Sequence, residues 1–312
     1  MKKKHVPADN REGVIVAHYG VAVDVLFAED NTRSMIRVKR NSGHVVGDKV
    51  VIKEEVLTRL ERSSELSRMD ARGGRHIVGA NLDVLCIVVS CEPLPPPGFI
   101  DRAIVSARAA HLRPVLIVNK SDLPCSADYL AAIESVYKKS LKIFTMSAEH
   151  GTGLEPLVTF FSEGHRGVFV GPTGVGKSSI LNALLPKINL TTGEISETKK
   201  RGRNTTTVST LHLLSDGGEL IDSPGFNDFG LVDISAEQLS TYFPGFEEAG
   251  RQACRFRDCK HREEPECRVI ELVDQGGIDT ARYTIYLQML TEVEALQIEP
   301  DYRERRHRRK KT

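Results

Sequence analysis

The sequence predicts a multidomain protein with an N-terminal OB-like β-barrel, a central α/β domain and a C-terminal α-helical lobe. Three observations predict this class: short alternating apolar runs near the N-terminus, strands alternating with helices in the middle, and a cysteine–histidine cluster near the C-terminus. A chain of 312 residues is long enough to bury several separate cores. The expected domains are the barrel with its linker at 1–70, the α/β domain at 71–232, and the helical lobe with a basic tail at 233–312.

Composition places the chain among ordinary globular proteins. It has 43 Lys and Arg against 42 Asp and Glu, a formal net charge of +1. This balance hides basic segments at both ends and does not exclude an anionic partner. Met1–Lys4 opens the chain without an apolar stretch behind it, and no apolar run has transmembrane length. We therefore expect a cytoplasmic protein with no membrane partner.

Short alternating runs separated by turn residues predict the barrel. They fall at 13–17, 21–25, 35–39 and 49–53. Small barrels of this kind often bind nucleic acid, and the alternative, that this one only packs on its neighbour, has about equal weight. The basic residues Arg37, Lys39 and Arg40 slightly favour RNA. Residues 62–76 have little apolar periodicity and contain a glycine pair, which predicts a linker or a mobile binding loop.

The central part of the chain alternates between apolar strands and helices. Strands are expected at 83–89, 115–118, 142–145 and 167–170, and helices at 100–110, 127–138 and 179–185. Alternation of this kind predicts βαβ units and a parallel sheet. Ligands of such sheets bind at the carboxyl ends of the strands, so the residues that follow each strand are the candidate site.

A glycine-rich loop follows the strand at 167–170. Its pattern, G-x-x-x-x-G-K-S, fits a P-loop, in which small residues let backbone N–H groups surround a polyphosphate. Lys177 is then expected to neutralise the outer phosphates, and Ser178 to bind Mg²⁺ at the start of a helix. A plain glycine-rich turn is the alternative. The phosphate-binding candidates are Gly171, Pro172, Thr173, Gly174, Val175, Gly176, Lys177, Ser178 and Ser179.

Two further motifs follow the strands at 115–118 and 142–145. They are N-K-x-D, formed by Asn119, Lys120, Ser121 and Asp122, and S-A, formed by Ser147 and Ala148. In the first motif, which GTPases use, one carboxylate accepts hydrogen bonds from N1–H and the exocyclic amine of guanine. Adenine offers neither in that geometry, and a buried acceptor without a partner costs about 1–3 kcal/mol. The motif therefore favours GTP over ATP, and the S-A backbone is placed to bind guanine O6.

Two segments after the P-loop look like the switch regions of GTPases. Residues 190–208 are polar and threonine-rich, which predicts a loop whose threonines reach Mg²⁺ and the γ-phosphate; an ordinary solvated loop is the alternative. The strand at 219–222 ends in D-S-P-G, where Asp222 is expected to hold Mg²⁺ through water and Gly225 to sense the γ-phosphate. The catalytic candidates are Lys177, Asn204, Thr205, Thr206, Thr207 and Gly225.

The order of these motifs is unusual. In most GTPases the P-loop comes first, whereas here N-K-x-D and S-A precede it. An α/β sheet tolerates new termini at surface loops, so the same site can close in space with another chain order. The sequence thus predicts a circularly permuted α/β P-loop GTPase domain whose D-S-P-G strand leads directly into the C-terminal lobe.

Four metal-binding side chains lie close together in that lobe. Cys254, Cys259, His261 and Cys267 form a Cys₃His set with the spacing C-x₄-C-x-H-x₅-C. A closed set of this kind predicts one structural zinc ion, because no coordination position remains for a substrate. Three free cysteines and a surface histidine are the alternative. Helices are expected at 281–290 and 291–296, before a basic tail that is either solvated or bound to rRNA phosphates.

Together, the barrel, the permuted domain with GPTGVGKSS and DSPGF, and the C-x₄-C-x-H-x₅-C lobe resemble the small-ribosomal-subunit-dependent GTPase A family (RsgA/YjeQ) over nearly the whole chain. The resemblance implies a GTP-hydrolysing ribosome biogenesis factor that binds the immature small ribosomal subunit and its rRNA late in maturation. It also implies that the subunit stimulates turnover and that the protein leaves after hydrolysis. The cofactors are then GTP or GDP, Mg²⁺ and one structural Zn²⁺. We expect a monomer.

One position departs from that family. Its members commonly have histidine directly before the triple threonine, in a motif implicated in hydrolysis, whereas this chain has Asn204. An amide can orient a water molecule but cannot accept its proton. Phe226 stands where many GTPases have a water-orienting glutamine, as it does in the family. The alternative function is therefore a nucleotide-gated rRNA-binding protein with weak or vestigial hydrolysis, and an ATP-dependent P-loop protein is a third hypothesis.

Overall fold

The computed structural model describes residues 10–53, 56–69, 74–185, 209–215, 217–223, 230–247, 249 and 254–309. The strands are β1 (Arg11–His18), β2 (Ala22–Phe27), β3 (Arg33–Arg37), β4 (Lys49–Lys53), β5 (Val56–Arg59), β6 (Glu65–Met69), β7 (Arg75–Ala80), β8 (Val84–Val89), β9 (Arg113–Val118), β10 (Lys142–Thr145), β11 (Arg166–Val170), β12 (Thr210–Leu213) and β13 (Glu219–Asp222). The helices are α1 (Phe99–Ala109), α2 (Ser126–Tyr137), α3 (Glu155–Ser162), α4 (Lys177–Leu184), α5 (Ala236–Tyr242), α6 (Arg268–Asp274) and α7 (Thr280–Arg309).

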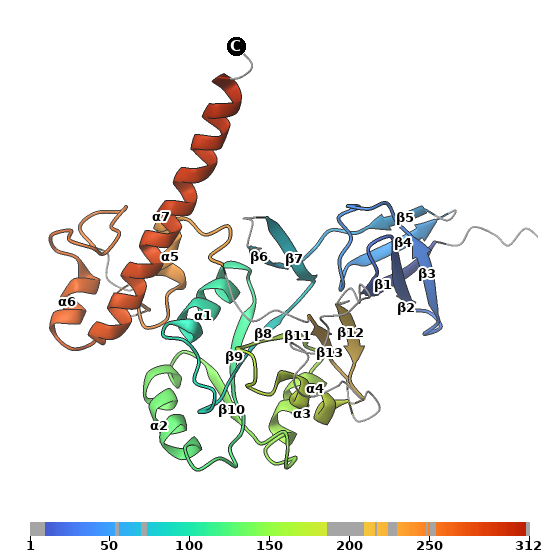
Figure 1. The fold of residues 1–312 in the computed structure, drawn as a ribbon, viewed down its shortest axis with the longest axis horizontal. Helices are drawn as coiled ribbons and strands as arrows, with labels where there is room; N and C mark the ends of the chain where they lie inside the picture. The colour runs from blue at the N-terminus through green and yellow to red at the C-terminus, as the bar shows by residue number, and fades with distance from the viewer. Residues whose placement is uncertain are drawn as a thin grey trace, which may run out of the picture.

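One large sheet runs through the N-terminal and central parts of the molecule (Figure 1). The order of its strands is β10-β9-β8-β11-β13-β12-β1-β2-β3, with β4 paired to β1 and β5 paired to β4. From β10 to β13 neighbouring strands are parallel, as the strand–helix alternation predicted. β12 is antiparallel to β13. The parallel strands therefore end at one common edge, where the motif loops follow them.

Helices cover both faces of the parallel strands. Alternate residues of β8 belong to two different buried clusters: Leu85 and Ile87 pack with α1 and α2, whereas Cys86 and Val88 pack with α3 and α4. All six residues of β8 are buried. A strand covered on both faces needs a continuous apolar sequence, because side chains on either side meet a helix. The predicted parallel sheet is confirmed, and the structure shows helices on both of its faces.

Five antiparallel strands form the N-terminal β region, which was predicted as an OB-like barrel. β1 lies between β2 and β4, while β3 and β5 are the outer strands of this part of the sheet. Its buried core consists of Ile15, Val23, Val25, Phe27 and Val50. These are the inward-facing residues of the alternating runs, so the four predicted strands are confirmed, and the structure adds β5.

A short contact joins this β region to the central sheet. β1 pairs with β12 at Ala17 and Thr210, and β12 in turn pairs with β13, where Thr210 lies opposite Asp222. β12 follows the first predicted switch segment and β13 precedes the second. β1 therefore adjoins β12, the strand after the first segment, and is separated by it from β13, the strand before the second segment.

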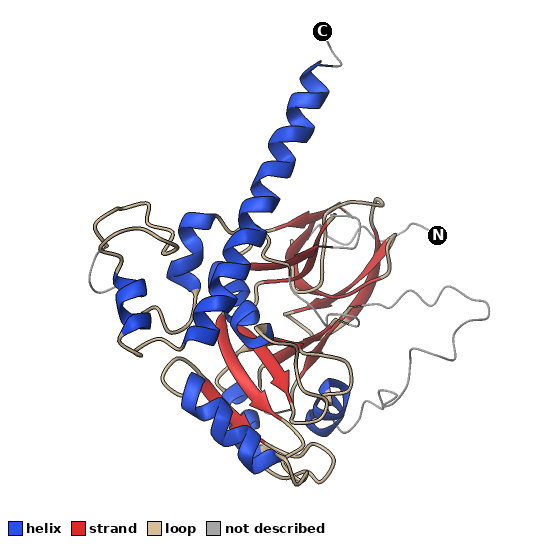
Figure 2. Ribbon diagram, turned by 60° about the vertical axis from the view of Figure 1, so that its left-hand side comes forward, coloured by secondary structure: helices blue, strands red, loops and turns tan. Residues whose placement is uncertain are grey.

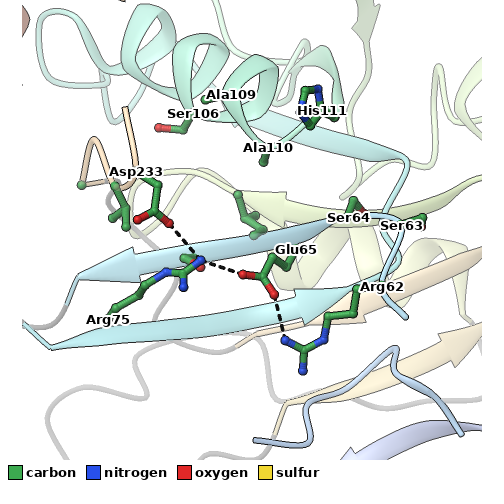
Figure 3. Close-up of a pocket in the computed structure, with 14 residues that line it drawn as sticks. Arg62, Ser63, Ser64, Glu65, Arg75, Ser106, Ala109, Ala110, His111 and Asp233 are labelled. Atoms are coloured by element: carbon green, nitrogen blue, oxygen red, sulfur yellow. Dashed lines mark hydrogen bonds and ion pairs between the residues drawn. The ribbon is translucent and has the colours of Figure 1, made fainter. Parts of the chain in front are cut away.

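Residues 62–76 differ from the expected linker or mobile loop. β6 and β7 form an antiparallel hairpin that is a separate two-stranded sheet. Ion pairs hold it in place: Arg75 contacts Glu65 at 2.6 Å and Asp233 at 2.9 Å, and Arg62 contacts Glu65 at 2.8 Å (Figure 3). With the end of α1, these side chains line a cavity of about 310 Å³. Ion pairs between polar residues leave no apolar periodicity in the sequence, and the Arg75–Asp233 pair joins residues far apart in the chain.

The C-terminal lobe packs on α1. The buried cluster that α5, α6 and α7 share includes Val105 of α1. The nearly buried carboxylate of Asp101 pairs with Arg282 at 2.9 Å, and Arg102 pairs with Glu292 at 2.7 Å. α1 begins on the loop that leaves the carboxyl end of β8. It therefore links the candidate site edge of the sheet to the lobe.

The last helix is longer than predicted. α7 runs without interruption from Thr280 to Arg309 and projects away from the rest of the molecule (Figure 2). The predicted helices at 281–290 and 291–296 are parts of it, and the helix continues into the basic tail as far as Arg309. None of the helices in the described parts of the chain combines the length and the apolarity needed to cross a membrane.

Candidate functional site

The predicted P-loop connects β11 to α4 at the carboxyl edge of the sheet. Gly174 and Gly176 have positive φ angles of 87° and 95°, and Gly176 is the N-cap of α4. A side chain at Gly176 would collide with the amide of Asn119, and one at Gly171 with the carbonyl oxygen of Val88. Glycine is therefore required both for the backbone conformation and for the close approach of the neighbouring loops.

Asn119 joins the three motif loops. Its side chain is buried, with 2% of its surface exposed. Nδ2 donates to the carbonyl oxygen of Val175 in the P-loop at 2.9 Å, and Oδ1 accepts from the backbone N–H of Ala148 at 3.1 Å. The N–H of Ser121 also donates to the carbonyl oxygen of Met146 at 3.0 Å. The permuted chain order thus leaves the N-K-x-D, S-A and P-loop motifs in one place.

Asp122 lies beside Ser147 and His150. A hydrogen bond from the Ser147 side chain is the main cause that holds the pKa of Asp122 below its usual value. Ser147 Oγ is 3.2 Å from His150 Nδ1, which is 3.9 Å from Asp122 Oδ1. The carboxylate stays ionised and can accept from a base that presents two donors. His150 was not among the predicted site residues, because it belongs to no motif and only the fold of the loop brings it to Asp122.

Lys177 and Asp222 interact at the phosphate end of the site. Lys177 Nζ donates to the carbonyl oxygens of Gly171 at 2.5 Å and Pro172 at 3.0 Å. Burial lowers the pKa of Lys177 to about 8, and the charge of Asp222 opposes this shift. Burial likewise raises the pKa of Asp222, against the effect of Lys177. A phosphate anion in the loop would give the partly dehydrated ammonium a strong partner.

The affinity for GDP is expected to fall as the pH rises through about 8. The pKa of Lys177 is lowered in the free loop, so its proton is lost above that pH, whereas a bound phosphate retains it. Linkage then predicts a dissociation constant about four times larger at pH 8.5 than at pH 7, and uptake of about half a proton per GDP bound at pH 8. Titration calorimetry in two buffers of different ionisation enthalpy measures this uptake.

Lys177→Arg is the control for this pH dependence. Arginine keeps its charge throughout this pH range, so the variant should bind GDP without taking up a proton at this position. Equal proton uptake by both proteins would show that another group titrates.

Several predicted residues lie outside the described residues. They are Asn204, Thr205, Thr206, Thr207 and Gly225. The described residues that flank them are at the same edge of the sheet: β12 begins at Thr210, opposite Asp222 at the end of β13. Ser178 and Ser179 lie in the first turn of α4, where Ser178 is exposed. The two Mg²⁺ candidates, Ser178 and Asp222, thus border the P-loop from α4 and β13.

Cys254, Cys259, His261 and Cys267 come together as predicted. Their ligand atoms all lie within 4.8 Å of one another. His261 Nδ1 is 3.6, 3.4 and 3.3 Å from the sulfurs of Cys254, Cys259 and Cys267, respectively. With Zn–S and Zn–N bonds of about 2.3 and 2.1 Å, the S···N edge of a zinc tetrahedron is about 3.6 Å long. The donor set and its spacing therefore fit one tetrahedral zinc ion.

The surroundings of this Cys₃His cluster fix its loop. The hydroxyl of Tyr283 donates to the carbonyl oxygen of His261 at 2.8 Å, and the N–H of Arg268 lies 3.4 Å from Cys254 Sγ. Burial lowers the pKa of His261, which favours the neutral imidazole that binds metals. Burial raises the pKa of Cys259 to about 12. Thiolates so close together need a cation, because they repel one another and lack water.

Cys91 and Cys125 form a disulfide bond, with their Cα atoms 6.0 Å apart. Cys91 follows β8, and Cys125 is the N-cap of α2, just after the N-K-S-D loop. No pattern in the sequence pairs these two cysteines. Cys91 follows β8, Cys125 follows β9 and the N-K-S-D loop, and these two strands are neighbours in the sheet. That adjacency of β8 and β9 is a property of the sheet order.

A parallel sheet with a P-loop at its carboxyl edge, and an N-K-S-D loop that contacts the P-loop but precedes it in the chain, defines a circularly permuted GTPase. A sequence profile described as RsgA GTPase matches residues 59–232. The chain belongs to the RsgA GTPase family.

Curated relatives and solved structures match nearly the whole chain. A protein of Pseudomonas fluorescens named small ribosomal subunit biogenesis GTPase RsgA is 38% identical over 294 residues, which cover 90% of this chain and 85% of that protein. A protein of the same name from Pseudomonas putida is 36% identical over the same shares. The crystal structure of YjeQ from Thermotoga maritima is 31% identical with a TM-score of 0.74, covering 91% of this chain and 99% of that one. YloQ, described as a circularly permuted GTPase, is 26% identical with a TM-score of 0.68, covering 95% and 98%.

Proposed function

We propose that this protein hydrolyses GTP to GDP and phosphate as a maturation factor of the small ribosomal subunit. It binds the immature subunit and its rRNA late in maturation and leaves after hydrolysis. The observation that supports this best is the buried Asn119, which contacts both the P-loop and the S-A turn and so unites a base site with a phosphate site. The relatives named small ribosomal subunit biogenesis GTPase support the choice of partner.

In this proposal the nucleotide lies across the carboxyl edge of the sheet. Asp122 accepts from the guanine N1–H and amine. The S-A turn of Ser147 and Ala148 borders O6, where the Ala148 N–H that donates to Asn119 can be shared with the base. Asn119, Lys120 and Ser121 hold that base-binding loop in position. The residues from Gly171 to Ser179 surround the phosphates, with Lys177 as their cation. The lowered pKa of Asp122 supports its role, because an ionised carboxylate is the better acceptor.

Hydrolysis in this proposal depends on positioning and charge. Ser178 and, through water, Asp222 would hold a Mg²⁺ ion, which would supply neutralisation of the phosphate charge. Lys177 stabilises negative charge on the phosphoryl group that is transferred, while Asn204 orients the attacking water. Thr205, Thr206 and Thr207 close over the γ-phosphate, and the N–H of Gly225 senses its presence.

A group of basic residues outside the proposed nucleotide site supports an RNA partner. Arg37, Lys39 and Arg40 are all exposed on and after the outer strand β3, where basic side chains can contact phosphates. The zinc ion that fits the Cys₃His cluster is structural in this proposal and shapes the lobe for the same rRNA. In this proposal the protein acts as a monomer. We place its action in the cytoplasm, with the maturing subunit.

GTP turnover by the native protein is expected to rise about 10²-fold when purified small ribosomal subunits are added, because RNA contacts order the switch segments and add electrostatic stabilisation. Turnover is measured as phosphate release at saturating GTP, with and without subunits. Asn204→His, which adds a proton acceptor, is expected to raise turnover without subunits.

Asn204→Ala is the matched control, because it removes the amide without adding a base. If small subunits raise GTP turnover by Asn204→Ala to the level of the native protein, Asn204 does not orient the attacking water. A native protein that subunits do not stimulate, combined with strong activity of Asn204→His, would instead favour the nucleotide-gated binding protein with vestigial hydrolysis.

A further inference from the structure

The Cys91–Cys125 disulfide connects two loops beside the base-binding motif. Cys91 lies two residues past β8, and Cys125 lies three residues past Asp122. A second contact joins the same two loops, because Lys120 Nζ donates to the carbonyl oxygen of Glu92 at 2.8 Å. The disulfide and this hydrogen bond together hold the N-K-S-D loop from both of its ends.

The loop that contains Cys91 also reaches the P-loop. A Cβ atom at Gly174 would have Cδ and Cγ of Pro93 as its nearest neighbours, each at 3.5 Å. Ser90 Oγ donates to the carbonyl oxygen of Glu92 at 3.0 Å and lies 3.3 Å from that of Pro93, which shapes the loop between Cys91 and the P-loop. The disulfide therefore lies where the loops of the base site and the phosphate site meet.

The disulfide is open to exchange with small thiols. Cys125 is exposed and Cys91 is half-buried, so a thiolate can approach from the Cys125 side. Exposed disulfides are the labile ones, and disulfides of a reducing compartment are usually transient. Cys86 of β8, by contrast, is fully buried, and burial strongly raises its pKa, so it does not compete as a thiolate.

We propose that Cys91 and Cys125 form a redox site that exchanges with low-molecular-weight thiols and sets how tightly the base-binding loop holds a guanine nucleotide. A small thiolate attacks Cys125 Sγ, the S–S bond breaks, and the Cys91 sulfur leaves as a thiolate that takes up a proton. Cys125 is then joined to the small thiol in a mixed disulfide. A second small thiolate attacks the small-thiol sulfur of that bond, and Cys125 leaves as a thiolate that takes up a proton. The protein disulfide gains two electrons and two protons, and two small thiols become one disulfide. Oxidation by the small disulfide reverses both steps.

Reduction is expected to weaken guanine binding because it frees the loop. Asn119 stays hydrogen-bonded to the P-loop and the S-A turn. The segment that follows Asp122, however, loses the cross-link from Cys125 to Cys91. Each binding event must then order the loop again, which lowers affinity mainly through faster dissociation. We expect GDP to dissociate about five times faster from the reduced protein than from the oxidised one. This coupling rests on the proposed recognition of guanine by Asp122.

The chemistry of the site is tested first, on the full-length protein with zinc present. Samples equilibrated with oxidised or reduced glutathione are denatured, alkylated with iodoacetamide and mapped by mass spectrometry. Cys91 and Cys125 should escape alkylation after oxidised glutathione and be alkylated after reduced glutathione, while Cys86, Cys254, Cys259 and Cys267 are alkylated in both. Full alkylation of Cys91 and Cys125 after oxidised glutathione would overturn the redox site, whatever nucleotide the protein binds.

The coupling is tested by the dissociation rate of fluorescent GDP from the same two samples. The native protein should show the fivefold difference, and Cys125→Ser should dissociate GDP at the fast rate in both. Cys86→Ala keeps the Cys91–Cys125 pair and should respond like the native protein. Equal rates for oxidised and reduced native protein would overturn the coupling. That result leaves the guanine assignment intact, because the Asp122 substitution described below tests the assignment separately.

Discussion

Asp122→Asn is expected to lower the affinity for GDP by about 10³-fold and to raise the affinity for xanthosine diphosphate. The carboxylate accepts hydrogen bonds from two donors of guanine, N1–H and the amine. The asparagine amide offers only one acceptor, and its NH₂ group faces one of these donors without forming a hydrogen bond. Xanthine has a carbonyl group where guanine has its amine, so the amide finds an acceptor there. Competition with fluorescent GDP measures both affinities on the same protein.

Asp128→Asn is the matched control for this exchange. Asp128 is exposed in the first turn of α2, six residues from Asp122, so its substitution makes the same charge change outside the site. Its nucleotide preference should stay that of the native protein. If ATP displaces GDP from the native protein at a similar concentration, the assignment of Asp122 as the guanine acceptor is wrong, and an ATP-dependent P-loop protein becomes the better reading.

Removal of zinc is expected to unfold the region around the Cys₃His cluster. Structural zinc contributes about 10–16 kcal/mol of apparent binding free energy in small zinc domains, and the cluster belongs to the same buried core as Phe243 and Tyr286. Amides of α6 and the first half of α7 should therefore lose their protection from hydrogen exchange in the metal-free protein. GDP binding should persist, because the base and phosphate loops lie on the sheet.

Metal analysis and a pair of variants complete this test. The native protein should contain one zinc ion per chain, and Cys259→Ser should lose both the ion and the protection. Glu263→Gln, in the same loop but without a ligand atom for the metal, should keep both. Protection of the region after Asp233 that survives complete removal of zinc by a chelator would count against a structural metal.

The central fold was predictable because its signals are local. The run from Val84 to Val89 is continuously apolar, as a strand with a helix on each face requires, and the structure buries all of it. Asn119 and Gly171 directly follow strands, so a parallel sheet had to bring them to one edge. The Cys₃His spacing was equally informative. The domain boundaries at 70/71 and 232/233 stay predictions, as do the catalytic roles of Asn204 and the threonines after it.

Features that depend on distant partners were not predictable. The β6–β7 hairpin uses ion pairs such as Arg75–Asp233, between residues far apart in the sequence, and polar pairs leave no periodicity. The contact of β1 with β12 rests on one pairing, Ala17 with Thr210. His150 has no motif of its own. Its role beside Asp122 depends on how the S-A loop folds back.

The sequence by itself determined which motifs are present, because motif residues lie at fixed local spacing: an N-K-S-D motif, a glycine-rich P-loop, an aspartate at the end of a strand and a Cys₃His set. Only the tertiary structure decided how these parts meet. The sheet order puts β8 between β9 and β11. The pairing of β8 with β9 brings Cys91 to Cys125, and the three-strand order places Asn119, after β9, within reach of the P-loop, after β11. Strand adjacency is set by packing across the whole sheet, which no local pattern encodes.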